Sequence, residues 1–217
     1  MLTKNINHGY IDFKEYEVRN KLMFIVLWLL VIIVGFSSNT YAGENKEDTA
    51  LLLIDIQNFY FPGGRSELVD PEPASLNAQQ LLQKFREKKL LVVHVRHIAE
   101  QGAEIHKNVR PLEGEKVFSK NHVNCFKDTD LLEYLRGHKV KNLVICGMMT
   151  HMCVEAAVRA AHDYDFETTL IHDACATRAL KFGDREVSAA DVHFSTLSSL
   201  NRYYARVLDT KTFLKDF

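Results

Sequence analysis

Apolar runs of strand length alternate with helical apolar stripes from about residue 50 to the end of the chain. The run 143–146 is continuously apolar, and Val154, Ala157, Val158 and Ala161 then recur at the i, i+3, i+4, i+7 spacing of an amphipathic helix. The same patterns predict strands at 50–54, 90–95, 117–119, 142–146, 168–171 and 204–208, and helices at 74–87, 130–136, from 151 onward, and at 187–201. This alternation predicts an α/β fold, a three-layer, doubly wound and mostly parallel sheet with helices on both faces.

Residues with reactive or charged side chains fall where the predicted strands end. They are Asp55, His94, Lys120, Cys153 and Asp173, in the order of the strands that they end or follow. Taken singly, a lysine after a strand is usually solvated, and an aspartate there often caps a turn. In a doubly wound sheet, however, ligands bind at the carboxyl ends of the strands. Their convergence on one edge therefore predicts a functional site.

Cys153 lies where a predicted strand gives way to a helix. Thr150 is a plausible N-cap, which would place Cys153 in the first helical turn. Free N–H groups and the positive end of the helix dipole favour a thiolate there. We therefore expect a nucleophile with a lowered pKa; the alternative is a small buried residue that packs the helix on the sheet.

Composition limits the class of protein. The chain has 217 residues, of which 47% are hydrophobic and 25% charged, which is enough for one sizeable core. A net charge of −1 gives no electrostatic support for a nucleic-acid partner. The four cysteines (Cys125, Cys146, Cys153 and Cys175) lack C-x-x-C and paired zinc-ligand spacing, so we expect them to be mostly free.

The N-terminal region predicts export. Leu22–Phe36 carries no charge, follows a segment with three lysines and one arginine, and precedes small residues ending at Ala42. We expect residues 1–42 to be a signal peptide, 43–49 a linker and 50–217 the folded domain of a periplasmic or secreted protein. An uncleaved membrane anchor is the alternative, although a span usually needs about 20 apolar residues; a true start near Met23 is a further one.

Three segments in the same order resemble one known family. They are "LLLIDIQNFYFPGG" (51–64), "VFSKNHVNCF" (117–126) and "GMMTHMCVEAAVRAAHDYDFETTLIHDACAT" (147–177). The chain resembles the isochorismatase-like cysteine hydrolases, a group that includes nicotinamidase, N-carbamoylsarcosine amidase and streptothricin hydrolase. The resemblance extends from about Ala50 to about Leu214.

The resemblance implies a catalytic triad of Asp55, Lys120 and Cys153. It also implies an oxyanion hole formed by the backbone N–H groups of Met149 and Cys153, with a cis peptide between Met148 and Met149. Cys153 would attack a carbonyl carbon and form a thioester that water hydrolyses. Because the isochorismatase branch lacks the cysteine, Cys153 favours hydrolysis of a C–N bond in a small carboxamide or cyclic amide.

Further expectations concern the substrate and the assembly. Phe59, Phe61, His122 and Phe126 flank the triad motifs and are candidate substrate-binding residues, as is Met149. The resemblance also implies a homo-oligomer.

Three histidines, His94, His97 and His106, are candidates for a metal-binding cluster. Nicotinamidases carry an Asp-x-His motif, but Val95 stands where the aspartate would be expected before His97. We therefore expect no metal and no other cofactor.

Two other functional classes remain open. One is a catalytically silent family member used for binding or assembly. The other is a periplasmic redox-active thiol protein in which Cys125 would be the resolving partner.

Overall fold

The computed structural model describes residues 46–217, which form one compact unit. The predicted signal peptide and residues 43–45 of the predicted linker lie outside the described residues. The linker was expected to reach Thr49, but residues 46–48 form a short 3-10 helix, η1 (Lys46–Asp48), and Thr49 begins the first strand. Within residues 46–217, no helix has the length and apolar character needed to span a membrane.

Six strands form one parallel sheet in the order β3-β2-β1-β4-β5-β8. Their bounds are β1 (Thr49–Ile54), β2 (Leu91–His97), β3 (Lys116–Lys120), β4 (Asn142–Met148), β5 (Glu167–Ala176) and β8 (Arg206–Leu208). Every residue of β1 is buried, as its continuous apolar sequence predicts for a central strand. The chain moves from β1 to β2 on one side and returns to β4 on the other, so a switch point lies between β1 and β4.

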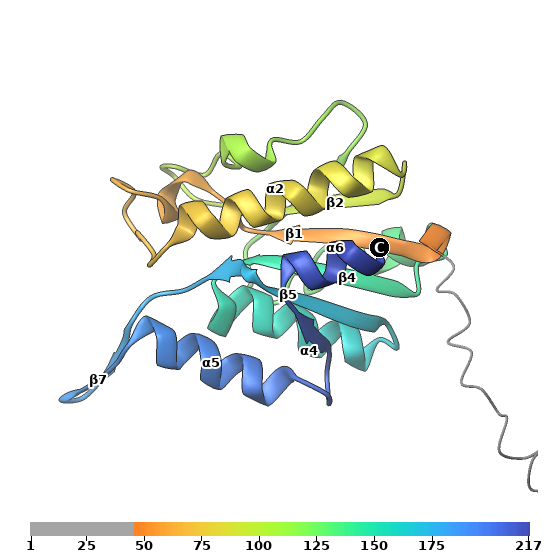
Figure 1. The fold of residues 1–217 in the computed structure, drawn as a ribbon. Coiled ribbons are helices and arrows are strands. Elements are labelled where there is room, and N and C mark those ends of the chain that lie inside the picture. Colours follow the sequence, from red (N-terminus) through yellow and green to blue (C-terminus); the bar gives the residue numbers. More distant parts are fainter. Residues whose placement is uncertain (1–45) are drawn as a thin grey trace, which may run out of the picture. The chain divides into compact units, whose positions relative to one another are not determined.

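Helices cover both faces of the sheet, which confirms the predicted three-layer fold (Figure 1). One face carries α2 (Pro71–Glu87) and α6 (Thr210–Asp216), where Phe85 stacks on Phe213 and Phe217. The other carries α3 (Leu131–Gly137), α4 (Glu155–Asp163) and α5 (Ala189–Leu200). Two further 3-10 turns, η2 (Asn58–Tyr60) and η3 (Lys107–Val109), lie in loops at the carboxyl edge.

Several predicted boundaries differ from the structure. Helix α2 begins at Pro71, three residues early, because proline suits the first helical position. Val187, expected in a helix, lies in a strand, and Ser188 caps α5 by accepting a hydrogen bond from the Asp191 N–H at 3.1 Å. The sequence patterns missed the hairpin of β6 (Leu180–Phe182) and β7 (Arg185–Val187), and they missed α6.

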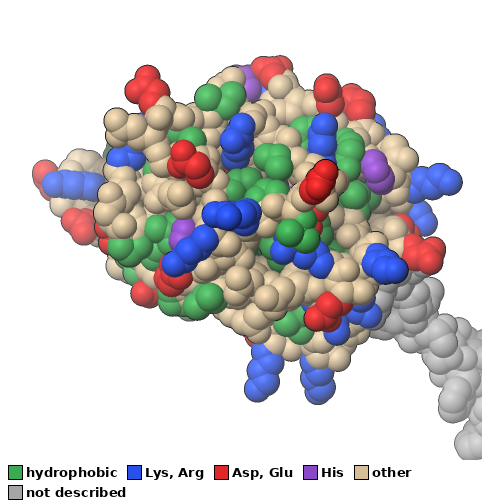
Figure 2. Space-filling model, turned by 90° about the horizontal axis from the view of Figure 1, so that it is seen from above, with side chains coloured by type: hydrophobic (Ala, Val, Ile, Leu, Met, Phe, Trp, Pro, Cys, Tyr) green, Lys and Arg blue, Asp and Glu red, His purple; other side chains and the backbone are tan. Residues whose placement is uncertain are grey.

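Acidic and basic side chains are interspersed on the upper face of the domain (Figure 2). The net charge of −1 for the whole chain agrees with this mixture of signs.

Gly147 allows β4 to pass closely beside β1. Its φ is +136°, and a Cβ atom there would lie 2.0 Å from the Ile54 carbonyl oxygen. We predict that Gly147→Ala lowers the free energy of unfolding by about 2–5 kcal/mol, because backbone strain and overpacking add. Urea denaturation followed by circular dichroism measures this change.

Gly137→Ala is the matched control for this prediction. A Cβ atom at Gly137, in the last turn of α3, would meet nothing within 4 Å. We expect this variant to be as stable as the wild type or slightly more stable. Equal stability of the two variants would contradict the role assigned to Gly147.

Candidate active site

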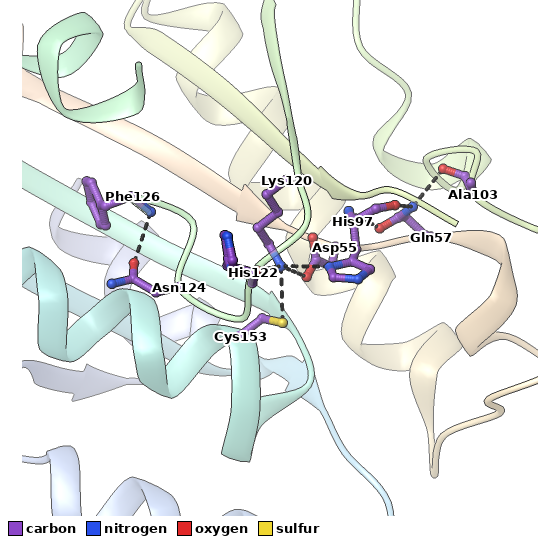
Figure 3. A network of polar contacts seen from close by, with 9 residues as sticks. All are labelled: Asp55, Gln57, His97, Ala103, Lys120, His122, Asn124, Phe126 and Cys153. Atoms are coloured by element: carbon purple, nitrogen blue, oxygen red, sulfur yellow. Dashed lines mark hydrogen bonds and ion pairs between the residues drawn. The ribbon is translucent and has the colours of Figure 1, made fainter. Parts of the chain in front are cut away.

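Asp55, Lys120 and Cys153 meet at the carboxyl edge of the sheet, as the sequence predicted (Figure 3). Asp55 follows β1, Lys120 ends β3, and Cys153 lies in η4 (Thr150–Val154), a π-helical turn after β4. Their exposed fractions are 0%, 1% and 5%. The three residues therefore form a buried cluster.

The Lys120 ammonium group lies at the centre of the cluster. Its Nζ is 2.7 Å from Asp55 Oδ2, and it donates hydrogen bonds to Cys153 Sγ at 3.2 Å and to the His122 carbonyl oxygen at 3.1 Å. An ammonium group has three protons to donate. The ion pair with Asp55 and the hydrogen bonds to Cys153 and His122 therefore hold the ammonium group between the three residues.

The backbone of Asp55 turns sharply as β1 ends. Its φ is +50°, in the left-handed region that aspartate tolerates better than most residues, and its N–H donates to the Val95 carbonyl oxygen at 2.9 Å. This hydrogen bond ties the end of β1 to β2. The carboxylate is thereby held beside Lys120.

Burial dominates the electrostatics of the cluster. Burial and, to a smaller extent, the Asp55 charge raise the pKa of Cys153 to about 12 against the opposing effect of Lys120. Burial also raises the pKa of Asp55 above its ordinary value, although Lys120 counteracts it. For Lys120, burial acts to lower the pKa, but Asp55 and Cys153 raise it above its ordinary value.

These directions correct the expected thiolate. A helix start and an ammonium group were expected to lower the pKa of Cys153. Burial of a second anion beside Asp55 is costly, however, and this cost raises the pKa instead. With a pKa of about 12, the Cys153 thiol is protonated at neutral pH. Chemistry at this thiol therefore requires removal of its proton at the moment of attack.

The turn that carries Cys153 differs in part from the expectation. The peptide between Met148 and Met149 is cis, as the resemblance implies. Thr150 is not an N-cap: it lies inside the π-helical turn, and α4 begins only at Glu155. The Thr150 hydroxyl contacts the Ala176 carbonyl oxygen and His193 instead.

His97 and Gln57 belong to the surroundings of the cluster and were not predicted there. Strand β2 extends two residues further than expected, so His97 lies beside Lys120, with Nδ1 3.5 Å from Nζ. Burial and the Lys120 charge lower the pKa of His97. The Gln57 amide fixes this strand end, because it accepts from the His97 N–H at 2.7 Å and donates to the His97 and Ala103 carbonyl oxygens at 2.9 and 2.7 Å.

The three histidines considered as metal ligands do not converge. His94 Nε2 lies 3.0 Å from Glu115 Oε2 in the core, whereas His106 stacks on Phe61 with ring centroids 3.6 Å apart. Between residues 46 and 217, no group of three or more His, Cys, Asp or Glu side chains is arranged to hold a metal ion. All four cysteines are free, as expected, and all four are buried.

The candidate substrate-binding residues do not all face the cluster. The Phe126 ring contacts those of Tyr164 and Phe166, and Figure 3 shows it turned away from Cys153. Phe59 packs edge-on against Tyr60. His122 supplies its carbonyl oxygen to Lys120, while its ring lies 2.8 Å from Asp128.

Tyr60 is a neighbour of the cluster that the motifs did not single out. Burial raises the pKa of Tyr60 well above its ordinary value, and the negative charge of Asp55 adds to this effect. At neutral pH the Tyr60 phenol is therefore neutral.

The fold and this cluster define a doubly wound α/β protein with a buried thiol at its ligand-binding edge. The isochorismatase domain profile matches residues 49–211. The isochorismatase family protein YddQ of Bacillus subtilis is 46% identical over 178 residues, which cover 77% of this chain and 99% of YddQ. Streptothricin hydrolase of Streptomyces noursei is 33% identical over 137 residues, 59% of this chain and 54% of that enzyme.

A solved structure agrees with these matches. The crystal structure of an isochorismatase hydrolase from Oleispira antarctica has a TM-score of 0.76 and 43% identity, and the match covers 78% of this chain and 97% of that one. The chain therefore belongs to the isochorismatase family.

We predict opposite effects of Asp55 and Lys120 on alkylation of Cys153. Because the Asp55 charge raises the Cys153 pKa and Lys120 lowers it, Asp55→Asn increases the thiolate fraction at pH 8 and Lys120→Met decreases it. Each pKa unit changes that fraction about tenfold while the thiol is mostly protonated. Iodoacetamide labelling followed by peptide mass spectrometry measures the rate.

Cys175 is the internal control, because burial raises its pKa without a contribution from Asp55 or Lys120. We expect its labelling rate to be the same in all three proteins. Slower labelling of Cys153 in Asp55→Asn than in the wild type would contradict the electrostatic interpretation.

Proposed function

We propose that this protein is a cysteine-dependent amidohydrolase that cleaves a C–N bond of a small carboxamide or cyclic amide through a thioester intermediate. One observation carries the proposal: a single buried ammonium group lies 2.7 Å from a carboxylate oxygen and 3.2 Å from a thiol sulfur. A proton can pass between these two partners while Lys120 stabilises whichever one is anionic. The family resemblance, which includes amide-hydrolysing members that carry the cysteine, supports the same reaction class.

In the first half of the proposed reaction, Cys153 attacks the carbonyl carbon. The thiol proton moves to Asp55 as the C–S bond forms, so that no free thiolate accumulates. The raised pKa of Asp55 suits it to hold this proton and then to donate it to the departing nitrogen. Cleavage of the C–N bond leaves an acyl group on Cys153 and releases ammonia or an amine.

In the second half, water hydrolyses the thioester. Asp55 accepts a proton from the attacking water, the C–S bond breaks, and the sulfur regains a proton. The products are a carboxylic acid and the free thiol. Lys120 remains protonated throughout, as its raised pKa requires.

The oxyanion formed in each half requires hydrogen-bond donors. We propose the backbone N–H groups of Met149 and Cys153, which lie at the start of the turn that carries the sulfur. Thr150 lies between them in sequence and is fully buried. Its hydroxyl donates to the Ala176 carbonyl oxygen at 3.3 Å and forms a hydrogen bond with His193 Nδ1 at 2.9 Å, which fastens the turn to β5 and α5.

We predict that Cys153→Ala abolishes turnover on any amide that the wild type hydrolyses. A panel of carboxamides, scored by ammonia release, identifies such a substrate. Loss of a covalent nucleophile lowers kcat by about 1,000-fold or more. In the wild type, rapid quenching and mass spectrometry are expected to find the acyl group on the Cys153 peptide.

Cys175→Ala is the control, since Cys175 is a buried cysteine whose sulfur donates to the Ile171 carbonyl oxygen and not to the cluster. We expect it to retain turnover. Near-normal activity of Cys153→Ala, or an acyl group on another residue, would overturn the proposal.

We predict that Thr150 is a positioning residue. Thr150→Val keeps the shape of the side chain but removes its hydrogen bonds to Ala176 and His193, so we expect kcat to fall about tenfold with little change in KM. Steady-state kinetics on a substrate found in the carboxamide panel measure both constants.

Thr196→Val controls for stability alone. Thr196 is also buried, and its hydroxyl bonds only to the Val192 carbonyl oxygen within α5. Each variant is expected to lose about 1 kcal/mol of stability, but only Thr150→Val should lose activity. Equal kcat values for the two variants would show that Thr150 has a structural role only.

A further inference from the structure

His97, the last residue of β2, is half-buried, whereas the three residues of the cluster beside it are buried. Its register partner in the parallel sheet is Lys120, so the two side chains leave the same face of the sheet. His97 Nδ1 is 3.5 Å from Lys120 Nζ, which in turn is 3.2 Å from Cys153 Sγ (Figure 3). Because the imidazole and the thiol contact the same nitrogen atom, a small amide bound at Cys153 comes within reach of the His97 ring.

The contact with Lys120 decides which nitrogen atom of His97 carries a proton. Burial lowers the pKa of His97, and the charges of Lys120 and Arg65 lower it further against the opposing charge of Asp55, so the ring is neutral at neutral pH. An ammonium group only donates hydrogen bonds, so Nδ1 faces Lys120 as an acceptor and the ring proton is on Nε2. Within residues 46–217, no group hydrogen-bonds to Nε2, and this atom is not enclosed by protein. His97 therefore offers a free N–H donor to a ligand.

Gln57 holds the backbone of His97 in place. Its side chain is fully buried, and its amide accepts a hydrogen bond from the His97 N–H at 2.7 Å and donates one to the His97 carbonyl oxygen at 2.9 Å. The same amide donates to the Ala103 carbonyl oxygen at 2.7 Å, which ties the strand end to the loop that follows β2. Both polar backbone groups of His97 are thus fixed before a ligand binds. A preorganised donor loses little conformational freedom on binding, which suits it to recognition.

We propose that His97 recognises the substrate by donating a hydrogen bond from Nε2 to an acceptor atom beside the scissile amide. The preferred substrate is then an amide that carries a second hydrogen-bond acceptor, and a simple alkyl amide is a poor substrate because it leaves the donor unpaired. The positive charges of Lys120 and Arg65 act on the same ring, and they favour an electron-rich atom there over an ammonium group. The scissile bond is an amide only if the proposed function holds; the donor and its acceptor do not depend on it.

Matched alkylating agents test this contact in the full chain without a known substrate. N-benzyl-2-chloroacetamide and its pyridylmethyl isomers differ only in whether a nitrogen acceptor replaces one ring CH group. With each rate divided by the rate for free cysteine, we expect at least one pyridylmethyl isomer to label Cys153 about tenfold faster than the benzyl compound at pH 8, the effect of one hydrogen bond. His97→Leu should reduce this ratio to about one. His97→Gln should keep most of it, because its amide N–H replaces the imidazole donor. Peptide mass spectrometry measures the rates.

The ratio of two labelling rates cancels any change that a variant makes in the pKa of Cys153. His138→Leu is the matched control, because His138 is an exposed histidine at the end of α3 and should leave the ratio unchanged. A wild type that favours no pyridylmethyl isomer, a ratio that survives in His97→Leu, equal ratios in His97→Leu and His97→Gln, or a loss in His138→Leu would each overturn the proposal. Alkylation forms a C–S bond and releases chloride without hydrolysing an amide, so this result is independent of the turnover of Cys153→Ala.

Discussion

The site depends on one ion pair, that of Lys120 with Asp55, which has no exposed surface in either side chain. Burying a single charge is costly, so each of these residues is tolerated only because the other is present. Together they are neutral, and a protonated Cys153 adds no charge. The three side chains can therefore be buried as a unit, but only while the thiol keeps its proton. The same constraint that allows the site to fold thus explains why the pKa of Cys153 is raised.

The ion pair in turn fixes the geometry of the sheet. Strand β2 lies between β1 and β3, so Lys120 must reach across two strand spacings, roughly 10 Å, to meet Asp55. Only a long side chain can bridge that gap. Cys153 approaches from the other side because β4 pairs with β1 and brings Gly147 opposite Ile54. A change of register in any of these strands would separate the carboxylate, the ammonium group and the thiol.

The sequence was sufficient for the fold class and for placing Asp55, Lys120 and Cys153 at one edge of the sheet, because both follow from the apolar runs and their ends. The roles of these residues as a catalytic triad came from the family resemblance and stay a prediction. Buried parallel strands are continuous apolar runs, and Asp55 and Lys120 come at or directly after such runs. The hairpin was missed because its strands have three residues each and bury none of them, which leaves no apolar pattern to detect. Helix α6, with seven residues, is likewise too short for a periodic stripe.

Side-chain directions and pKa values were harder to predict. Phe126 is near Lys120 in sequence but faces Tyr164 and Phe166, and His94 faces Glu115, because the local turn of the backbone decides where each ring points. The pKa of Cys153 is a balance between burial, Asp55 and Lys120. The sequence identifies those neighbours but not the depth at which they are buried. Sequence therefore identified which groups meet, and only the structure gave the protonation state in which they meet.

One side chain links the turn that carries the thiol to helix α5. The Thr150 hydroxyl lies 3.3 Å from the Ala176 carbonyl oxygen, to which it donates, and 2.9 Å from His193 Nδ1. Burial and His172 lower the pKa of His193, which favours the neutral ring in this contact. His193 belongs to α5, whereas Thr150 belongs to the same turn as Cys153. The hydrogen bond between Thr150 and His193 therefore couples the position of α5 to the position of the Cys153 turn.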